Sequence, residues 1–133
     1  MTTARRGDLF DPRCPTRQLL DRVGTKWTSM AVKVLAEQAP GEVRFADLRR
    51  RMPGVSQKML SVTLRSLARD GLVARRVEAT TPPSVYYRLT DLGLSLEEPL
   101  AALRAWAERH MPEIEERNRR AADAPSDGGP GTP

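Results

Sequence analysis

The residues best suited to chemistry lie in the middle of the chain, between a Pro-Gly pair and an Asp-Gly pair. Leu60, Leu64 and Leu67 recur at spacings of four and three, which is typical of the buried stripe of a helix. The opposite face has no acidic side chain that would repel a phosphate backbone. Its amide, cationic, hydroxyl and apolar groups match base edges in the major groove, although an ordinary solvated face is the alternative. The candidate contacts are Ser56, Gln57, Lys58, Ser61, Val62 and Arg65.

Cys14 is the only cysteine, which excludes an intramolecular disulfide and favours a reducing compartment. It directly precedes Pro15, where a helix can begin, and Arg13 and Arg17 are close in sequence. A helix N-terminus and cationic neighbours favour the reactive thiolate. An intersubunit disulfide, a mixed disulfide or an adduct is then accessible. The alternative is a small buried residue at an interface, or an inert cap.

Other reactive groups are sparse. His110 is the only histidine, so a site with several histidines from one chain is excluded. The sequence contains no glycine-rich phosphate loop and no triad-like spacing of nucleophile and base. No apolar run approaches the roughly 18 residues of a membrane span, and the N-terminus lacks a signal-peptide core. We therefore expect no enzyme activity, cofactor, metal or membrane partner, and a cytoplasmic location.

Short helices are expected to position the candidate face. One opens at Pro15 and ends at Gly24, and a second is capped by Thr25. A short helix beginning near Phe45 leads to the turn 53–55, after which Ser56 caps the helix that carries the candidate face. Two helices joined by such a turn form a helix-turn-helix unit.

Alternating residues after Gly71 predict two strands, 72–78 and 85–89, joined by a tip that contains a Pro-Pro pair. A hairpin in this position makes the unit a winged helix. Its clustered arginines could lie along a sugar–phosphate backbone, or they could be ordinary surface residues. Together with cationic residues near the helix-turn-helix, the candidate backbone and wing contacts are Lys26, Arg49, Arg50, Arg75, Arg76, Ser84 and Arg88.

A long helix is expected from Thr90 or Asp91 to about Arg120, with kinks or breaks at Pro99 and Pro112. Its apolar stripe is large for a helix outlying a small domain, so a second copy of the chain is a natural partner. The candidate dimer contacts are Leu96, Leu100, Leu103 and Trp106. Trp27, Met30, Trp106 and Met111 could instead line a ligand pocket, but core packing is the preferred interpretation.

The 133 residues carry a net charge of +5, distributed unevenly. Residues 44–88 hold 10 basic and 3 acidic residues, whereas residues 89–133 hold 5 basic and 9 acidic residues. The central charge of +7 favours nucleic acid as the partner, and the acidic C-terminal third is expected to lie away from it.

These motifs resemble the HxlR-type winged helix-turn-helix regulators, a family related to the MarR-type regulators. The resemblance covers roughly residues 14–110. It rests on Cys14-Pro15, Gly24-Thr25-Lys26-Trp27, Phe45-Ala46-Asp47-Leu48-Arg49, Pro53-Gly54-Val55-Ser56-Gln57-Lys58-Met59-Leu60, Leu64-Arg65-Ser66-Leu67, Asp70-Gly71-Leu72-Val73, Pro82-Pro83-Ser84-Val85-Tyr86-Tyr87-Arg88-Leu89-Thr90 and Leu92-Gly93.

The resemblance implies a bacterial homodimer, expected to be a repressor, that binds a palindromic double-stranded DNA operator and is nucleoid-associated when bound. Some members sense oxidants or electrophiles at the position of Cys14, so an oxidant or small-molecule effector is implied. The chain has Glu78-Ala79-Thr80 where the family often has Tyr-Pro-Glu, and Ser84 where the family often has a basic residue. We therefore expect the tip of the wing to bind phosphate more weakly than is usual in the family. The alternative outside this class is an adaptor that has lost DNA binding.

The sequence therefore predicts an α+β, mainly helical fold: a winged helix-turn-helix with N- and C-terminal dimerisation helices. The predicted parts are a flexible arm (1–13), the DNA-binding domain (14–90), a dimerisation helix (91–120) and a disordered tail (121–133).

Overall fold

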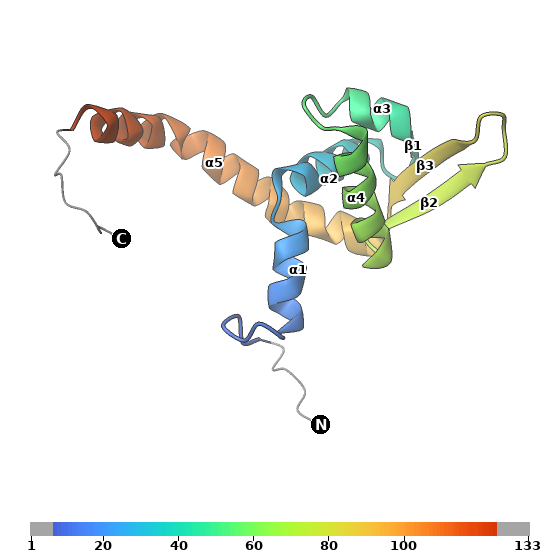
Figure 1. The fold of residues 1–133 in the computed structure, drawn as a ribbon, viewed down its shortest axis with the longest axis horizontal. Helices are drawn as coiled ribbons and strands as arrows, with labels where there is room; N and C mark the ends of the chain where they lie inside the picture. Colours follow the sequence, from blue (N-terminus) through green and yellow to red (C-terminus); the bar gives the residue numbers. More distant parts are fainter. Residues whose placement is uncertain (1–6, 125–133) are drawn as a thin grey trace. The chain divides into compact units, whose positions relative to one another are not determined.

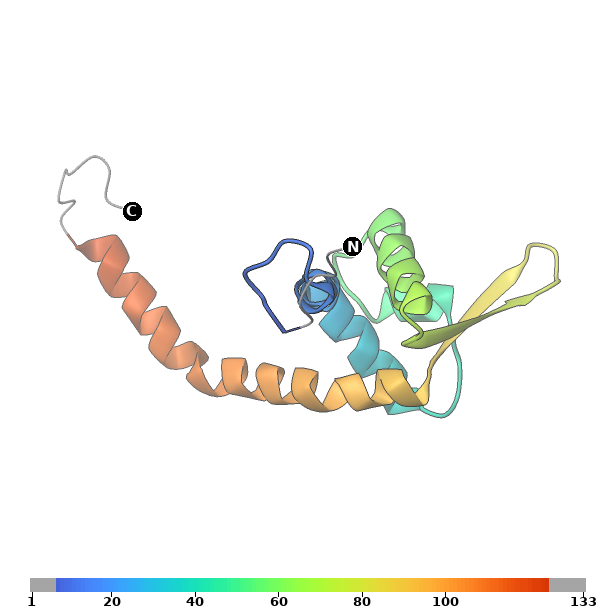
Figure 2. The ribbon, with the colours of Figure 1, turned by 90° about the horizontal axis from the view of Figure 1, so that it is seen from below.

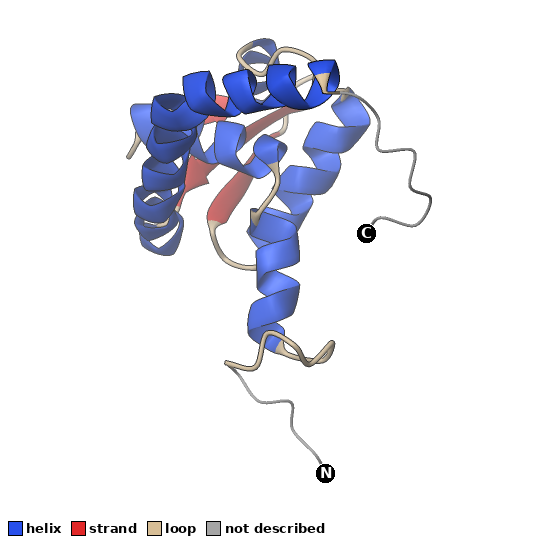
Figure 3. Cartoon of the chain, turned by 90° about the vertical axis from the view of Figure 1, so that its left-hand side faces the viewer, coloured by secondary structure: helices blue, strands red, loops and turns tan. Residues whose placement is uncertain are grey.

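A helix-turn-helix followed by a β-hairpin is present in the computed structural model, which describes residues 7–124 (Figure 1). Helices dominate and the strands form one small sheet, so the predicted winged helix-turn-helix class is confirmed (Figure 3). The helices are α1 (Pro15–Val23), α2 (Lys26–Gln38), α3 (Phe45–Arg50), α4 (Gln57–Arg69) and α5 (Asp91–Asp123), and the strands are β1 (Val43–Arg44), β2 (Val73–Glu78) and β3 (Ser84–Leu89).

Two helices begin at the hydroxyl caps that the sequence predicts. The Thr25 hydroxyl accepts a hydrogen bond from the Thr28 amide at 3.2 Å, and the Ser56 hydroxyl accepts one from the Met59 amide at 3.0 Å. These bonds satisfy first-turn amides that have no partner inside the helix. Gly54 forms the turn before α4 with φ at 88°, a conformation that favours glycine.

The three strands form an antiparallel sheet in the order β1-β3-β2. Val43 of β1 and Arg75 of β2 both pair with Tyr87, which places β3 in the centre. The hairpin of β2 and β3 projects beyond α3 and α4 (Figure 2). Strand β1 has only two residues, which are too few to show alternation in the sequence.

The core lies where α2, α3 and α4 meet the base of the sheet. Leu35, Leu48 and Leu64 are completely buried, one from each of these helices. Trp27 and Met30 are half-buried and pack against this core, which supports core packing over a ligand pocket for these two residues.

The chain divides into two units, the first ending at Leu100 and the second beginning at Ala101. In the first, Leu96 and Leu100 pack against the domain's own core. In the second, α5 runs on to Asp123 with Leu103 and Trp106 exposed.

Helix α5 is continuous through Pro99 and Pro112, so of the kinks or breaks predicted at these prolines, the breaks do not occur. A proline removes one backbone hydrogen bond, and the strong helix formers around these two maintain the helix. Residues 121–123 of the predicted tail are helical. The rest of that tail from 125 onward, and residues 1–6 of the predicted arm, lie outside the described residues.

Candidate nucleic-acid interface

Helix α4 divides its side chains between a buried and an open face. Leu60, Leu64 and Leu67 are at most 2% exposed, as their spacing predicts. The outward face carries Lys58, Val62 and Arg65, which are exposed. The outward face can therefore meet another molecule without disturbing the packing of the helix.

The flank of α4 that faces the hairpin borders a recess of about 530 Å³. Gln57, Ser61 and Arg65 reach it from the helix, and Arg75 reaches it from β2. None of the described residues that line the recess is acidic. Its remaining walls are Phe45, Ala68, Val85 and Tyr87. Four of the predicted contacts thus line one recess. Together with the exposed Lys58 of α4 they form the surface that we call the reading face: Gln57, Lys58, Ser61, Arg65 and Arg75.

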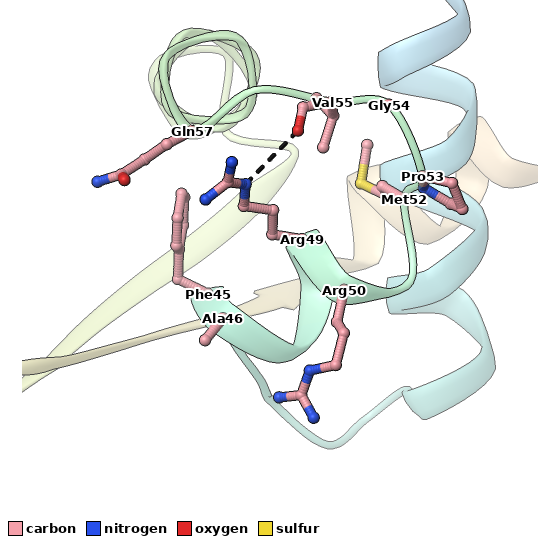
Figure 4. A pocket seen from close by; sticks show the side chains of 9 residues that line it. All are labelled: Phe45, Ala46, Arg49, Arg50, Met52, Pro53, Gly54, Val55 and Gln57. Carbon is pink, nitrogen blue, oxygen red and sulfur yellow. Dashed lines mark hydrogen bonds between the residues drawn. The ribbon is translucent and has the colours of Figure 1, made fainter.

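A second hollow, of about 480 Å³, lies at the helix-turn-helix elbow (Figure 4). Phe45 and Gln57 border both hollows, so the reading face continues onto α3. The Arg49 guanidinium lies on the Phe45 side and its Nε donates to the Val55 carbonyl at 3.5 Å. Arg50 points away from that side and forms an ion pair with Asp47.

Phe45 is a part of this surface that the predicted contacts omit. It is half-buried, and its ring centroid lies 6.5 Å from that of Tyr87. Its spacing from Leu48 and Met52 predicts a packing role, and sequence spacing alone does not show that it borders the open face.

Lys26 lies at the start of α2, next to the turn that precedes α4. Its ammonium is 4.7 Å from the centroid of the Trp27 ring, a cation–π contact. The Trp27 ring in turn lies 3.7 Å from the position that a Cβ would take at Gly54. This places a cation beside the elbow, as expected.

The wing arginines do not form one group. Successive side chains of a strand point to opposite faces, and Arg75 faces α4. Arg76 and Arg88 belong to the other face, where they pair in register with Tyr86 and Ala74. The clustered wing arginines are therefore divided between the two faces of the hairpin.

The Arg76 side chain is already engaged within the protein, in an ion pair with Glu42 and a cation–π contact with Tyr86. Its Nε lies 3.0 and 2.9 Å from the two carboxylate oxygens of Glu42, and its guanidinium carbon is 4.5 Å from the centroid of the Tyr86 ring. The hydrogen bond from Arg76 lowers the pKa of Glu42, and the same bond raises the pKa of Arg76. The pair joins the segment before β1 to the wing, a role that the sequence did not indicate.

Ser84 is buried at 9% exposure, and its hydroxyl lies 3.5 Å from that of Thr80. The hydroxyl of Ser84 is thus engaged within the wing, and its contact with the DNA backbone stays a prediction. The Ser56 hydroxyl caps the start of α4. Its main role is therefore to position the helix that carries the reading face.

Cys14 occupies the N-cap position of α1, immediately before Pro15, as predicted. Its side chain is 0% exposed. Hydrogen bonds close the preceding turn: the Cys14 amide donates to the Asp11 carbonyl at 2.9 Å and the Arg13 amide to the Asp11 carboxylate at 2.9 Å. Arg13 pairs with Asp11, and Arg17 donates to the Phe10 carbonyl at 3.3 Å. These two cations therefore hold the turn.

The predicted dimer contacts separate into two pairs. Leu96 packs against the core of its own domain and Leu100 belongs to that core, with Leu100 only 8% exposed, so a dimer contact by these two stays a prediction. Leu103 and Trp106 stay exposed at 62% and 52%. The predicted contacts omitted α1, where Leu19 and Leu20 are also exposed.

Within residues 7–124, no group of three or more histidine, cysteine or acidic side chains is placed to hold a metal ion. No helix in this part of the chain is long and apolar enough to cross a membrane.

Known proteins resemble this chain over most of its length. A family model described as HxlR-like helix-turn-helix matches residues 22–115. The HTH-type transcriptional regulator YtfH of Escherichia coli is 41% identical over 110 residues, which cover 83% of this chain and 85% of that protein. The solved structure of YtfH from Salmonella typhimurium is 38% identical with a TM-score of 0.78, covering 86% of this chain and 99% of that one.

A further structural relative is YodB of Bacillus subtilis. Its diamide-treated form is 31% identical with a TM-score of 0.58, covering 74% of this chain and 96% of that one. The same regulator has been solved in a reduced form and with a quinone bound.

Proposed function

Because the chain belongs to the HxlR-like helix-turn-helix family of transcriptional regulators, we propose that it binds a palindromic operator as a homodimer and represses transcription. Each subunit reads one half-site with α4 in the major groove, and the half-sites lie about one helical turn apart. The protein acts in the cytoplasm, at the nucleoid when it is bound to its operator.

The reading face is the observation that carries this proposal. It combines an open helix face, free of acidic residues, with an arginine that reaches the same recess from the wing. Lys58 and Arg65 suit guanine, Gln57 suits adenine, and the Val62 methyl groups suit the methyl group of thymine.

We assign the contacts with the DNA backbone to the cationic side chains that lie on the same side of the protein as the reading face. Arg75 belongs to the reading face, and Lys26 and Arg49 lie at the adjoining helix-turn-helix elbow. Arg50 and Arg88 are expected to contribute less, because Arg50 pairs with Asp47 and Arg88 lies on the opposite face of the hairpin.

The test starts from duplexes selected by the wild-type protein from a random library. Arg65→Ala should weaken binding to the selected site by about 1–3 kcal/mol, or about 5- to 150-fold, if Arg65 contacts a base. The matched control is Arg117→Ala, which removes an exposed ion pair within the second unit. Equal affinities of wild type and Arg65→Ala would contradict the assignment of α4 as the recognition helix. A reporter gene with the selected site upstream would distinguish repression from activation.

We also propose that DNA binding responds to oxidants or electrophiles through Cys14. The support is the relative YodB, solved after diamide treatment and with a quinone bound, together with the place of Cys14 at the start of α1. Diamide takes two hydrogens from two thiols and becomes a hydrazine. With one cysteine in each chain, the second thiol comes from the partner subunit or from a small thiol. A quinone would instead form a carbon–sulfur bond with the thiolate, and the proton would end on the resulting hydroquinone.

Wild type and Cys14→Ser treated with diamide or benzoquinone test this response. Wild type should lose operator affinity and Cys14→Ser should keep it. Dithiothreitol should restore wild-type binding after diamide, because it reduces disulfides, and should not do so after the quinone. If both proteins respond alike, Cys14 is not the switch.

A further inference from the structure

Residues of α1 and of the segment just before α5 both contact the C-terminal end of α4, the helix that carries most of the reading face. Arg22, near the end of α1, donates from Nε and Nη2 to the two carboxylate oxygens of Asp70 at 2.7 and 3.1 Å. Thr90, just before α5, donates from its hydroxyl to the Gly71 carbonyl at 2.7 Å. The three residues that follow α4, Asp70 to Leu72, thus receive contacts from segments far away in sequence.

Asp70 is an unusual choice for its position. It is the C-cap of α4, and a negative charge at a helix C-terminus is opposed by the helix dipole. A two-pronged arginine bond compensates that cost and fixes direction as well as distance. The bond also raises the pKa of Arg22, and the Asp70 side chain is only 19% exposed.

Arg22 is itself held firmly. Its backbone carbonyl accepts a hydrogen bond from the Thr28 hydroxyl at 3.0 Å, and Thr28 is 2% exposed. The next residue, Val23, belongs to the core. The end of α1 is therefore fixed on α2 and α4, whereas Leu19 and Leu20, one turn earlier, are 38% and 50% exposed.

We infer that Arg22 and Asp70 are a positioning pair that sets the direction of α1 relative to the recognition helix α4, and through it the spacing of half-sites that the dimer accepts. The inference rests on the proposed function, with the exposed face of α1 meeting the second copy. In a dimer built on that face, a rotation of α1 against α4 would change the distance between the two recognition helices. Neither residue touches DNA in this role.

The experiment varies the half-site spacing of the selected operator by one and two base pairs in each direction. Wild type should lose about tenfold or more in affinity at each altered spacing, because the half-sites rotate around the duplex. Arg22→Ala should flatten this profile to within about threefold, with binding to an isolated half-site unchanged within about twofold. The exchange of charges, Arg22→Asp with Asp70→Arg, should restore the profile, and Arg22→Lys should restore it partly because one prong is lost.

A purely structural role would give a different result. Arg22→Ala would then lower affinity equally at every spacing and at the isolated half-site, which would overturn the inference. Wild type that binds DNA without preferring a spacing would also overturn it while leaving DNA binding intact, whereas absence of any selected sequence would remove the proposed function itself. Arg117→Ala, which breaks a pair within one helix turn, should keep the wild-type profile.

Discussion

At the scale of single residues, Gly93 has the least room for a side chain among the glycines that the structure describes. A Cβ there would lie 1.9 Å from the Leu72 carbonyl oxygen and 2.9 Å from Leu89 Cδ2. The first of these atoms is backbone immediately before β2 and cannot move aside as a flexible side chain can. The close approach of α5 to the sheet therefore depends on glycine.

Gly93→Ala should accordingly destabilise the domain by about 1–3 kcal/mol, the usual cost of overpacking a filled interior. Urea denaturation followed by circular dichroism measures this free energy. Gly7→Ala is the control, because no atom lies within 4 Å of its Cβ position, and its effect should stay within about 0.5 kcal/mol. Equal stabilities of the two variants would contradict the tight approach.

The carboxylate of Glu42 gives the molecule a pH-dependent contact. Its pKa is lowered from 4.5 by the hydrogen bond from Arg76, so the contact contributes fully above that value and is lost as the pH falls through the lowered pKa. Glu42→Gln should therefore be less stable than wild type at pH 7, and the two should converge under acidic conditions. Urea titrations from pH 7 to about pH 3 would show this convergence. A difference in the free energy of unfolding that stays constant over this range would contradict the stabilising role of the Glu42–Arg76 pair.

At the scale of elements, the sequence predicts what local rules control. The caps Thr25 and Ser56 and the stripe Leu60, Leu64 and Leu67 are read from neighbours three or four residues apart, and all are confirmed. They fix where α2 and α4 begin and which face of α4 is open. The reading face follows from the same local pattern.

Long-range pairing is what the sequence does not reveal. Arg22 meets Asp70 across 48 residues and Arg76 meets Glu42 across 34, and periodicity carries no signal for either pair. An apolar stripe is equally ambiguous about its partner. Leu100 and Leu103 belong to one stripe of α5, yet the first is buried in its own domain and the second is exposed.

The turn before α1 is an element whose stability should control the reactivity of Cys14. The thiol is 0% exposed, and the Asp11 carboxylate holds the turn through the Arg13 amide and guanidinium. Asp11→Ala should open the turn and speed alkylation of Cys14 by iodoacetamide by about threefold or more. Asp21→Ala, a matched loss of one acidic residue on α1, should leave the rate unchanged. Equal rates in all three proteins would mean that another motion exposes the thiol.

At the scale of the whole molecule, charge and apolar surface are assigned to different parts of the chain. Residues 44–88 carry a net charge of +7 and contribute most of the reading face, whereas residues 89–133 carry −4. The second unit, residues 101–133, holds 5 basic and 6 acidic residues and exposes Leu103 and Trp106. Its nearly neutral surface does not attract a DNA backbone, and a second copy can cover its apolar side chains.

Leu100 and Leu103 therefore provide a matched pair for testing the proposed homodimer. Leu100→Ala should lower the free energy of unfolding by about 2–5 kcal/mol, because it leaves a cavity in the core. Leu103→Glu should instead leave the fold of each chain intact and shift the protein toward monomer in sedimentation velocity, by about tenfold or more in the dissociation constant, because a buried interface would have to hold an unpaired charge. Operator affinity should fall with the dimer, since each half-site alone binds weakly. If Leu103→Glu and Trp106→Glu both sediment and bind as wild type does, the second unit is not the dimer contact.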